Sequence, residues 1–295
     1  MSDGDPSAVP FSKGHGLGND YLVVDRAQLP APLTPARIRL LCDRHRGIGS
    51  DGILEADLAR DIALRIYNPD GTEAEKSGNG LRIFGAWLYD SGRVRLDEWF
   101  TVRLIRDSVR MRVERELAHG ALMIRVEIGR ATFRGEAEGF TPSSGETLDF
   151  ELALPRGGSA RVNTVSLSNP HCVVFVDALE RADFLARAPQ LCTHPAFRAG
   201  TNVQLARVTG PRTLEAWIWE RGAGETLASG SSASAVCAAA VRRGLVEAGE
   251  LEVLMEGGRV EVTVSSEFDV VLLGEAQMIF RGELERGAAA AYAEG

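Results

Sequence analysis

Two serines that each precede a glycine lie in segments that repeat along the chain. Residues 66–92 align without a gap on residues 218–244, so that Ser77 corresponds to Ser229 at a separation of 152 residues. Each segment is predicted to form a strand, a turn and the start of a helix, and internal similarity of this kind indicates that one structural unit is used twice. A doubled unit can place two chemically similar groups on opposite sides of one small substrate, an arrangement that suits a racemase.

The segments that follow the two serines are predicted to form buried helices. Residues 233–241 contain no charged residue and residues 81–88 are nearly as apolar, so we expect each helix to be surrounded by protein. Gly92 and Gly244 are suited to a left-handed cap at the helix ends. The unpaired N–H groups and the positive dipole end at each helix start can bind an anion, so two such starts could hold one α-carboxylate.

Several candidate residues also have an ordinary structural explanation. Ser77 and Ser229 could act only as N-caps, a position that serine favours at any helix start. Asn68 begins the turn sequence Asn-Pro-Asp-Gly, which needs no substrate, and His171 could be a core histidine with satisfied hydrogen bonds. Residues 47–52 match G-x-G-x-x-G, but they follow a predicted helix and precede a strand, which is the wrong order for a dinucleotide-binding fingerprint.

Composition and charge are typical of a soluble globular protein with two domains. The chain has 295 residues, 44% of them hydrophobic, which is enough for two domains of roughly 130–150 residues with separate cores. The net charge of −8 and the lack of a stripe rich in Lys and Arg disfavour nucleic acid as a partner. Residues 1–6 contain two aspartates and no apolar core segment, and no later run approaches about 18 apolar residues, so we expect a cytoplasmic protein without a membrane partner.

Cysteine and lysine usage limits the metal and cofactor chemistry that is available. The four cysteines lie far apart without C-x-x-C spacing, so we expect buried, reduced thiols and neither a zinc site nor a disulfide framework. They are Cys42, Cys172, Cys192 and Cys237. The only lysines are Lys13 and Lys76, and neither is flanked by residues typical of a cofactor phosphate site, which argues against pyridoxal phosphate. We therefore expect no metal and no cofactor.

Hydrophobic periodicity and turn residues predict alternating strands and helices in both halves. The predicted strands are residues 21–25, 53–55 and 63–67, further strands between 100 and 134, and then 172–176, 213–219, 252–254, 260–265 and 270–280. The predicted helices begin near Thr34, Ser77, Arg181 and Ser229. The first domain is predicted to pass into the second between residues 127 and 132.

Seven short motifs are distributed over most of the chain. They are residues 15–20 (HGLGND), 42–49 (CDRHRGIG), 68–71 (NPDG), 77–80 (SGNG), 169–172 (NPHC), 200–203 (GTNV) and 219–226 (WERGAGET). Together they resemble the motifs of diaminopimelate epimerases, the cofactor-independent amino-acid epimerases of lysine and cell-wall biosynthesis. Jointly the seven motifs are highly specific.

The resemblance implies an α/β (α+β) fold of two pseudo-symmetric lobes, each a curled, mostly antiparallel sheet around a central helix, with the active site in the cleft between them. We expect an N-terminal lobe of residues 1–129, to which residues 278–295 return, and a C-terminal lobe of residues 130–277. The implied activity interconverts LL- and meso-diaminopimelate by removing and replacing an α-proton from opposite faces. The resemblance also suggests a homodimer.

The resemblance further assigns residues to the site. The distal amino-acid end of the substrate would be bound by Asn19, Asn68, Asn169, Asn202, Glu220 and Arg221. A guanidinium group suits a carboxylate, while amides and a carboxylate suit an ammonium group. The carboxylate at the reacting centre would be bound by Gly78, Asn79, Gly230 and Ser231. The catalytic pair would be Ser77 and Ser229, with the titratable groups of His171 and Glu220 beside them.

The chain departs from the family pattern at the catalytic pair, because the family carries a cysteine in each motif where this chain has Ser77 and Ser229. A thiolate at a helix N-terminus has a lowered pKa and can abstract an α-proton while the opposite thiol donates one. A serine hydroxyl does not ionise comparably without a base beside it, although it can still donate a proton. We therefore expect slow or redirected chemistry unless His171, Glu220 or Lys76 activates a serine.

Three interpretations follow from this departure. The chain could be a natural epimerase with an adjusted acid–base system, or a deliberate Cys-to-Ser variant of an ordinary epimerase. Alternatively, the scaffold could serve a different amino-acid racemase or eliminase, or a catalytically impaired protein that only binds an amino acid. Because a binding protein would tolerate loss of His171 and Glu220, substituting each and measuring affinity separately from turnover distinguishes these classes.

Overall fold

The computed structural model describes residues 9–142 and 145–294, and its contacts divide the chain into two compact units. Unit 1 consists of Met1–Arg125 and Glu275–Gly295, and unit 2 consists of Val126–Gly274. The boundaries expected from the sequence, after residue 129 and before residue 278, lie a few residues further along the chain. Residues 1–6, with their two aspartates, lie outside the described part.

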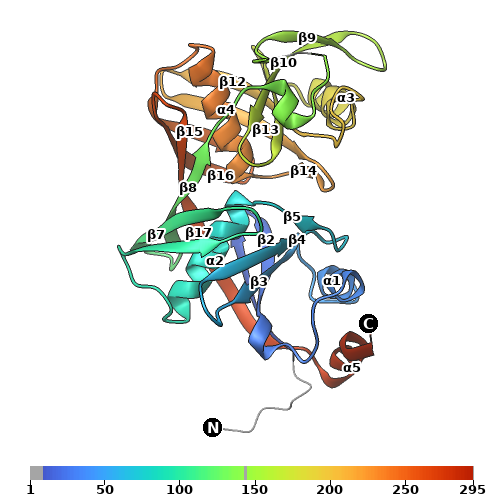
Figure 1. Cartoon of the computed structure of the whole chain (residues 1–295), viewed down its shortest axis with the longest axis vertical. Coiled ribbons are helices and arrows are strands. Elements are labelled where there is room, and N and C mark those ends of the chain that lie inside the picture. Colours follow the sequence, from blue (N-terminus) through green and yellow to red (C-terminus); the bar gives the residue numbers. More distant parts are fainter. Residues whose placement is uncertain (1–8, 143–144, 295) are drawn as a thin grey trace. The chain divides into compact units, whose positions relative to one another are not determined.

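Unit 1 combines most of the first half of the chain with its C-terminal segment (Figure 1). Its elements in chain order are β1 (Pro10–Gly16), β2 (Asn19–Asp25), the short helix η1 (Arg26–Gln28), α1 (Pro35–Cys42), β3 (Ile53–Asp57), β4 (Ala63–Tyr67), β5 (Glu73–Ala74), α2 (Gly78–Asp90), β6 (Trp99–Arg103), β7 (Ser108–Glu116) and α5 (Arg286–Glu294). Strands β8 (Leu122–Arg130) and β17 (Asp269–Glu283) have residues in both units.

Unit 2 repeats the same succession of strands and helices. Its elements are η2 (Gly135–Glu138), β9 (Phe150–Ala153), β10 (Ser159–Ser166), β11 (Pro170–Phe175), α3 (Arg181–Cys192), β12 (Asn202–Gly210), β13 (Thr213–Glu220), β14 (Gly224–Thr226), α4 (Gly230–Arg242), β15 (Gly249–Met255) and β16 (Gly258–Val264). The expected strands and helix starts are present in both units. The sequence analysis did not predict β1, β5, β9, β10, β12, β14, α5 or the short helices η1 and η2.

Strand pairing follows one scheme in both units. In unit 1, β1–β2 is antiparallel, β2–β3 parallel, β3–β4 and β4–β5 antiparallel, β4–β6 parallel and β6–β7 antiparallel. In unit 2, β10–β11 is antiparallel, β11–β12 parallel, β12–β13 and β13–β14 antiparallel, β13–β15 parallel and β15–β16 antiparallel. The duplication inferred from the sequence is therefore a duplication of topology, and the predicted fold of two similar, mostly antiparallel α/β halves is confirmed.

The helices α2 and α4 form the centre of each unit (Figure 1). Ten of the 13 residues of α2 are buried, as are 11 of the 13 residues of α4. In unit 1, α2 packs against β1, β2 and β7, and in unit 2, α4 packs against β10, β11, β12, β13 and β16. The prediction of two buried helices is confirmed, and the apolar sequence of each helix is explained because sheet surrounds it.

Both central helices end in the same hydrogen-bonded cap. Gly92 follows α2 with φ +70°, and Gly244 follows α4 with φ +68°. Gly92 N donates to the carbonyl of Tyr89, and the next residue donates to Leu88; the second helix has the equivalent pair of bonds. This is the Schellman arrangement, in which a residue in the left-handed region closes the last turn. The predicted left-handed caps are confirmed.

Alanine at Gly92 or Gly244 is expected to lower the free energy of unfolding by about 1–2 kcal/mol, because an L-residue is strained in this conformation. A Cβ atom at either position would meet no atom within 4 Å, so the cost arises from the backbone alone. Gly287, in α5, is the matched control: it also has open space around it but no positive φ, and alanine there should stabilise by about 0.5–1 kcal/mol. Urea denaturation of the three variants measures whether each substitution lowers or raises the free energy of unfolding. Equal changes in all three variants would contradict the assignment of the two left-handed caps.

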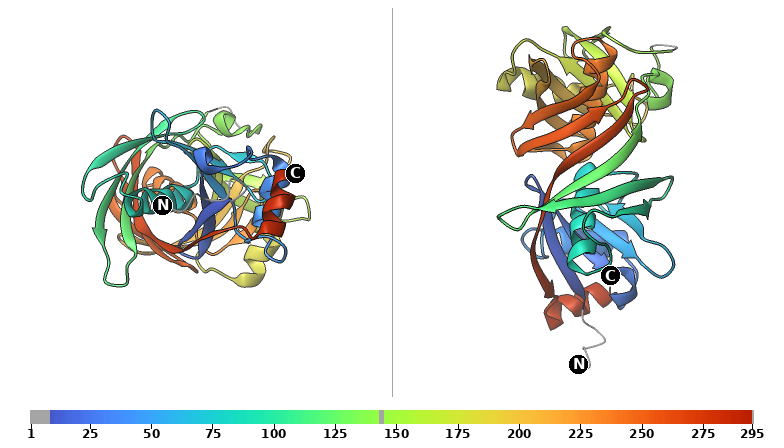
Figure 2. Two further views of the ribbon diagram at one scale, coloured as in Figure 1. Left: turned by 90° about the horizontal axis from the view of Figure 1, so that it is seen from below. Right: turned by 90° about the vertical axis from the view of Figure 1, so that its left-hand side faces the viewer.

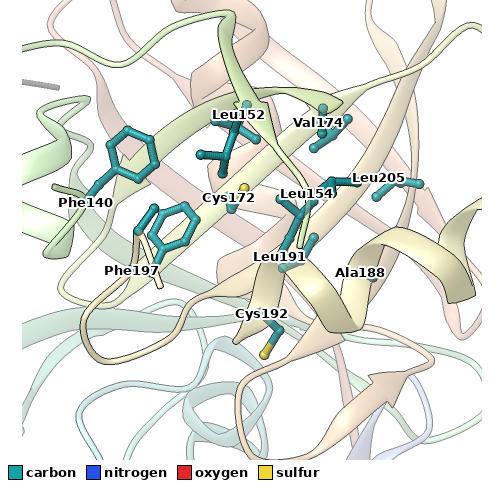
Figure 3. Packing of buried hydrophobic residues seen from close by; sticks show 14 of the residues in the cluster. Phe140, Leu152, Leu154, Cys172, Val174, Ala188, Leu191, Cys192, Phe197 and Leu205 are labelled. Carbon is teal, nitrogen blue, oxygen red and sulfur yellow. The ribbon is translucent and has the colours of Figure 1, made fainter. Parts of the chain in front are cut away.

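Each unit has its own apolar core. In unit 2, residues of β9–β12 and α3 pack with two phenylalanines from the connecting segments, as Figure 3 shows. In unit 1, the C-terminal helix α5 packs beside α1 (Figure 2). The Tyr292 hydroxyl donates to the carbonyl of Ala31 at 2.7 Å. All four cysteines are free and buried, as predicted. Within the described ranges, no helix is both long and apolar enough to span a membrane.

Candidate active site

The hydroxyl of Ser77 caps the start of α2. Ser77 has extended backbone angles (φ −139°, ψ 119°), and its Oγ accepts a hydrogen bond from Gly80 N at 3.0 Å. The phenol oxygen of Tyr21, on β2, lies 3.4 Å from the same Oγ. Ser77 is therefore an N-cap, as its ordinary structural explanation predicted. It also has a second hydroxyl group beside it, from a residue that the sequence analysis did not identify.

Ser229 caps α4 with nearly the same geometry. Its backbone angles are φ −145° and ψ 122°, and its Oγ accepts from Ser232 N at 3.5 Å. The hydroxyl of Ser231 lies 3.4 Å from that Oγ. The carbonyl of Gly230 accepts a hydrogen bond from Ser234 Oγ at 2.8 Å. The two serines differ in burial, since Ser229 is only 3% exposed and Ser77 is partly exposed.

Three of the residues predicted to bind substrate come together at the start of α2. Asn79 Nδ2 donates to Asn19 Oδ1 at 2.9 Å, and Asn19 Nδ2 donates to Asp51 Oδ2 at 2.8 Å. Gly78 precedes Asn79 in the first turn of the helix and is buried. A guanidinium from the next turn, that of Arg82, donates to Asn79 Oδ1 at 2.8 Å. The amides of Asn19 and Asn79 are therefore parts of one hydrogen-bond chain.

Asn68 lies in the turn between β4 and β5. Its backbone N donates to the carbonyl of Thr72 at 2.8 Å, and its Nδ2 donates to Thr72 Oγ1 at 2.9 Å. The turn predicted from Asn-Pro-Asp-Gly is thus confirmed. Within the part of the chain that the structure describes, the side-chain oxygen of Asn68 has no hydrogen-bond partner, so it can still accept from an ammonium group.

His171 is completely buried at the start of β11, and both ring nitrogens are hydrogen-bonded. Nε2 lies 3.0 Å from Asn169 Oδ1, and Nδ1 lies 3.2 Å from Gln204 Nε2. Burial and the positive charge of Arg221 lower the pKa of His171 to about 3, so the ring is neutral at physiological pH. Because Gln204 donates to Nδ1, the ring proton is on Nε2, where it holds the oxygen of Asn169.

This hydrogen bonding bears on the chemistry predicted for His171. The ring orients Asn169, whose amide nitrogen has no protein partner among the described residues and can donate to a substrate. Gln204 Nε2 also donates to Ser232 Oγ at 2.9 Å, which links the histidine to the first turn of α4. Across residues 9–142 and 145–294 no hydrogen bond joins His171 to Ser229, so the arrangement favours a positioning role over direct activation of the serine.

The remaining predicted residues lie at the ends of β12 and β13. Asn202 Nδ2 donates to the carbonyl of Pro170 at 3.0 Å, and Asn202 Oδ1 accepts from Arg221 N at 2.9 Å. The exposed guanidinium of Arg221 donates to the carbonyl of Ala199 at 3.1 Å. Glu220 is the last residue of β13 and is partly exposed. Asn202 thus holds the main chain that carries Arg221.

Lys76 was the third group considered as a base for Ser77. Its Nζ lies 2.7 Å from Asp107 Oδ2, and its side chain is only 1% exposed. The ammonium is therefore paired with a carboxylate from the turn between β6 and β7. This ion pair holds the residue before Ser77 in place.

Each unit thus presents a hydroxyl at the start of a buried helix, with side-chain amides fixed nearby. Such a helix start stabilises negative charge through its N–H groups. The sequence analysis missed Tyr21, Gln204, Arg82 and Asp51. Among these, Tyr21 lay two residues after Asn19, as His171 lies two residues after Asn169, and this correspondence was the available signal.

Comparison with known proteins connects this geometry with a family. The sequence matches the family model described as diaminopimelate epimerase over residues 11–134 and 163–279. The curated Diaminopimelate epimerase 2 of a Nostoc species is 38% identical over 279 residues, which cover 94% of this chain and 95% of the relative. The diaminopimelate epimerase of Pelotomaculum thermopropionicum is 34% identical, with 92% and 98% covered.

Solved structures of more distant proteins have the same fold. A hydroxyproline epimerase from Agrobacterium vitis superposes with a TM-score of 0.70 at 15% identity, covering 98% of this chain and 99% of the other. A predicted epimerase from Pseudomonas aeruginosa gives a TM-score of 0.66 at 22% identity, with 94% and 99% covered. These likenesses establish the fold alone. On the family model and the curated relatives together, the chain belongs to the diaminopimelate epimerase family.

Proposed function

We propose that the chain is an amino-acid epimerase that interconverts LL- and meso-diaminopimelate without a cofactor. The named relatives are 34–38% identical over nearly their whole length. The observation that carries the proposal is the repeated helix start, in which Ser77 and Ser229 share backbone angles and N-cap hydrogen bonds at a separation of 152 residues. Reaction at two faces of one α-carbon needs two such groups.

In the proposed reaction, the Oγ of the serine at one helix start, in its ionised form, takes the α-proton, and the electron pair of the broken C–H bond is delocalised onto the α-carboxylate. The hydroxyl at the other helix start donates a proton to the opposite face. The first serine then loses the proton that it took and the second regains one, directly or through water, which restores the starting state. The N–H groups of Gly78, Asn79, Gly230 and Ser231 would stabilise the added negative charge on the carboxylate. Fixed dipoles of this kind act most strongly where water is excluded.

The far end of the substrate would be bound by the amide and charged groups around the two helix starts. Asn169 offers an amide donor, Asn68 offers an amide oxygen, and the side chain of Arg221 is exposed. These suit a carboxylate and an ammonium group. Glu220, Asn19 and Asn202 complete the proposed set. A cytoplasmic location, a homodimer and independence of nucleic acid and membranes stay predictions.

The test is proton NMR of the purified protein with LL-diaminopimelate in deuterated water. We expect loss of the α-proton signal as deuterium is incorporated, together with appearance of the meso isomer. The double variant Ser77→Ala, Ser229→Ala is expected to lose both processes, because the hydroxyl groups supply the protons.

The possible outcomes separate the interpretations of the serine pair. Exchange with epimerisation above the double-alanine control supports a serine-based epimerase. A different product, such as one from elimination, would replace the proposal with another activity. Binding of diaminopimelate with no exchange would leave a protein that only binds the amino acid.

A further inference from the structure

A continuous chain of hydrogen bonds joins a buried guanidinium to a carboxylate through two side-chain amides in unit 1. Arg82 Nη2 donates to Asn79 Oδ1 at 2.8 Å, Asn79 Nδ2 donates to Asn19 Oδ1 at 2.9 Å, and Asn19 Nδ2 donates to Asp51 Oδ2 at 2.8 Å. Arg82 is completely buried, and Asn19 and Asn79 are nearly so. Both residues belong to the site of the proposed function, Asn19 through its side chain and Asn79 through its backbone N–H group.

The charged residues at the ends of this chain fix the direction of every bond within it. A guanidinium group can only donate and a carboxylate can only accept. The oxygen of each amide must therefore point towards Arg82, and each NH₂ group must point towards Asp51. Reversing either amide would place its NH₂ group against a guanidinium or its oxygen against a carboxylate. The hydrogen-bond chain thus determines which atoms Asn19 and Asn79 present to a ligand.

Both ends of the chain are held by further contacts. Arg82 Nε donates to the carbonyl of Glu275 at 3.2 Å. Burial lowers the pKa of Arg82 to about 10, opposed by the charge of Glu275, so the guanidinium is charged at neutral pH. At the other end, Arg44 Nη2 donates to Asp51 Oδ1 at 2.7 Å and also bonds Asp20. The side chain of Asp51 is 39% exposed, so this end reaches solvent.

The corresponding position in unit 2 has no such cation. Ser234 stands 152 residues after Arg82, and its Oγ donates to the carbonyl of Gly230 at 2.8 Å. Arg82 Nη1 makes the equivalent contact to the carbonyl of Gly78 at 3.4 Å. Both side chains therefore bond the first turn of their helix, but only Arg82 brings a charge. At this position unit 1 therefore carries a buried guanidinium where unit 2 carries a neutral hydroxyl.

We propose that Arg82 and Asp51 are positioning residues for substrate: they fix the amides of Asn19 and Asn79, and Arg82 adds positive charge beneath the carboxylate that the start of α2 binds. This inference rests on the proposed function. It gives the two halves different tasks, with unit 1 as the stronger anion site. Neither residue is expected to touch the substrate, so their loss should weaken binding more than it slows proton transfer.

The experiment compares Asp51→Asn, Arg82→Met and the matched control Ser234→Ala, measuring KM and kcat for diaminopimelate, Kd by calorimetry and Tm. Asp51→Asn keeps size at a partly exposed position but lets the amides turn, and Arg82→Met removes the charge. We expect each to raise KM and Kd about tenfold while kcat changes less than threefold. Ser234→Ala is expected to stay within twofold in KM, because it removes a contact to the first turn without a charge.

The outcomes separate this inference from the proposed function. If the wild-type protein turns over diaminopimelate and both variants keep KM and Kd within twofold, whatever their Tm, the inference is wrong. The hydrogen-bond chain from Arg82 to Asp51 then has only a structural role. If the wild type binds diaminopimelate without turnover, the epimerase proposal is wrong. The Kd values of the variants then decide whether Arg82 and Asp51 position the substrate. If the wild type neither binds nor reacts, both fall. Should Arg82→Met not fold, Asp51→Asn still gives the answer.

Discussion

Replacing Ser77 and Ser229 together with cysteine is expected to increase α-proton exchange from LL-diaminopimelate by two to four orders of magnitude, the range of general acid–base catalysis. Each position is an N-cap whose side-chain atom accepts a hydrogen bond from the helix. A thiol there is stabilised as thiolate by the positive helix end, whereas a hydroxyl is not comparably ionised. The rate of deuterium incorporation, followed by NMR in deuterated water, measures the effect.

The single variants Ser77→Cys and Ser229→Cys test whether thiolate formation at the helix start causes this increase. Burial raises the pKa of the native Cys172 and Cys237 thiols well above the ordinary range. Ser229 is almost wholly buried and Ser77 is partly exposed, so Ser77→Cys is expected to supply the better base. An increase below threefold in the double variant would show that the native hydroxyls are already activated. The phenol of Tyr21, 3.4 Å from Ser77 Oγ, would then be the first group to test, by Tyr21→Phe.

Acidification from pH 6.5 towards pH 3 is expected to destabilise the protein through His171. Its pKa in the folded state is about 3, because the ring is buried and lies near Arg221, against an ordinary value of 6.5. Between these values the unfolded chain binds one more proton than the folded one. The stability that is present above pH 6.5 is therefore lost as the pH falls, at roughly 1.4 kcal/mol per pH unit.

Urea denaturation of the wild type and of His171→Gln at pH 6.5, 5.5 and 4.5 measures this contribution. Other groups also titrate in this range. The informative quantity is therefore the difference between the two proteins in how steeply the free energy of unfolding falls with pH. The variant loses the hydrogen bonds to Asn169 and Gln204 and is expected to be less stable at pH 6.5, but its stability should fall less steeply. Parallel slopes would mean that His171 takes up a proton in the folded state.

The parts of the fold that local chemistry controls could be predicted from the sequence. The starts of α2 and α4 follow from serine N-caps, and their ends follow from Gly92 and Gly244 in the left-handed region. Strand β10 was missed because buried Asn163 and Thr164 interrupt its apolar pattern. The fold satisfies Asn163 with a bond from its Nδ2 to the carbonyl of Val173 and another from Asp149 N to its Oδ1.

The candidate site was predicted residue by residue but not as a network. Tyr21 and Ser77 are 56 residues apart in the chain, and no periodicity indicates that their hydroxyls meet. Arg82 interrupts a nearly apolar helix and gave no signal that its guanidinium is completely buried. Partners that are distant in sequence appear only once the strands pair, because strand register sets which side chains become neighbours.

The constant separation of 152 residues between the two helix starts bears on where insertions and deletions can occur in the gene. One inserted residue within α2 or α4 would turn the rest of the helix by about 100° and move its buried face out of the core. Downstream of the glycine caps this restriction ends, since six residues lie between Gly92 and the start of β6 and four lie between Gly244 and the start of β15. Insertions and deletions among homologues should therefore accumulate after the caps and be purged from the two helices.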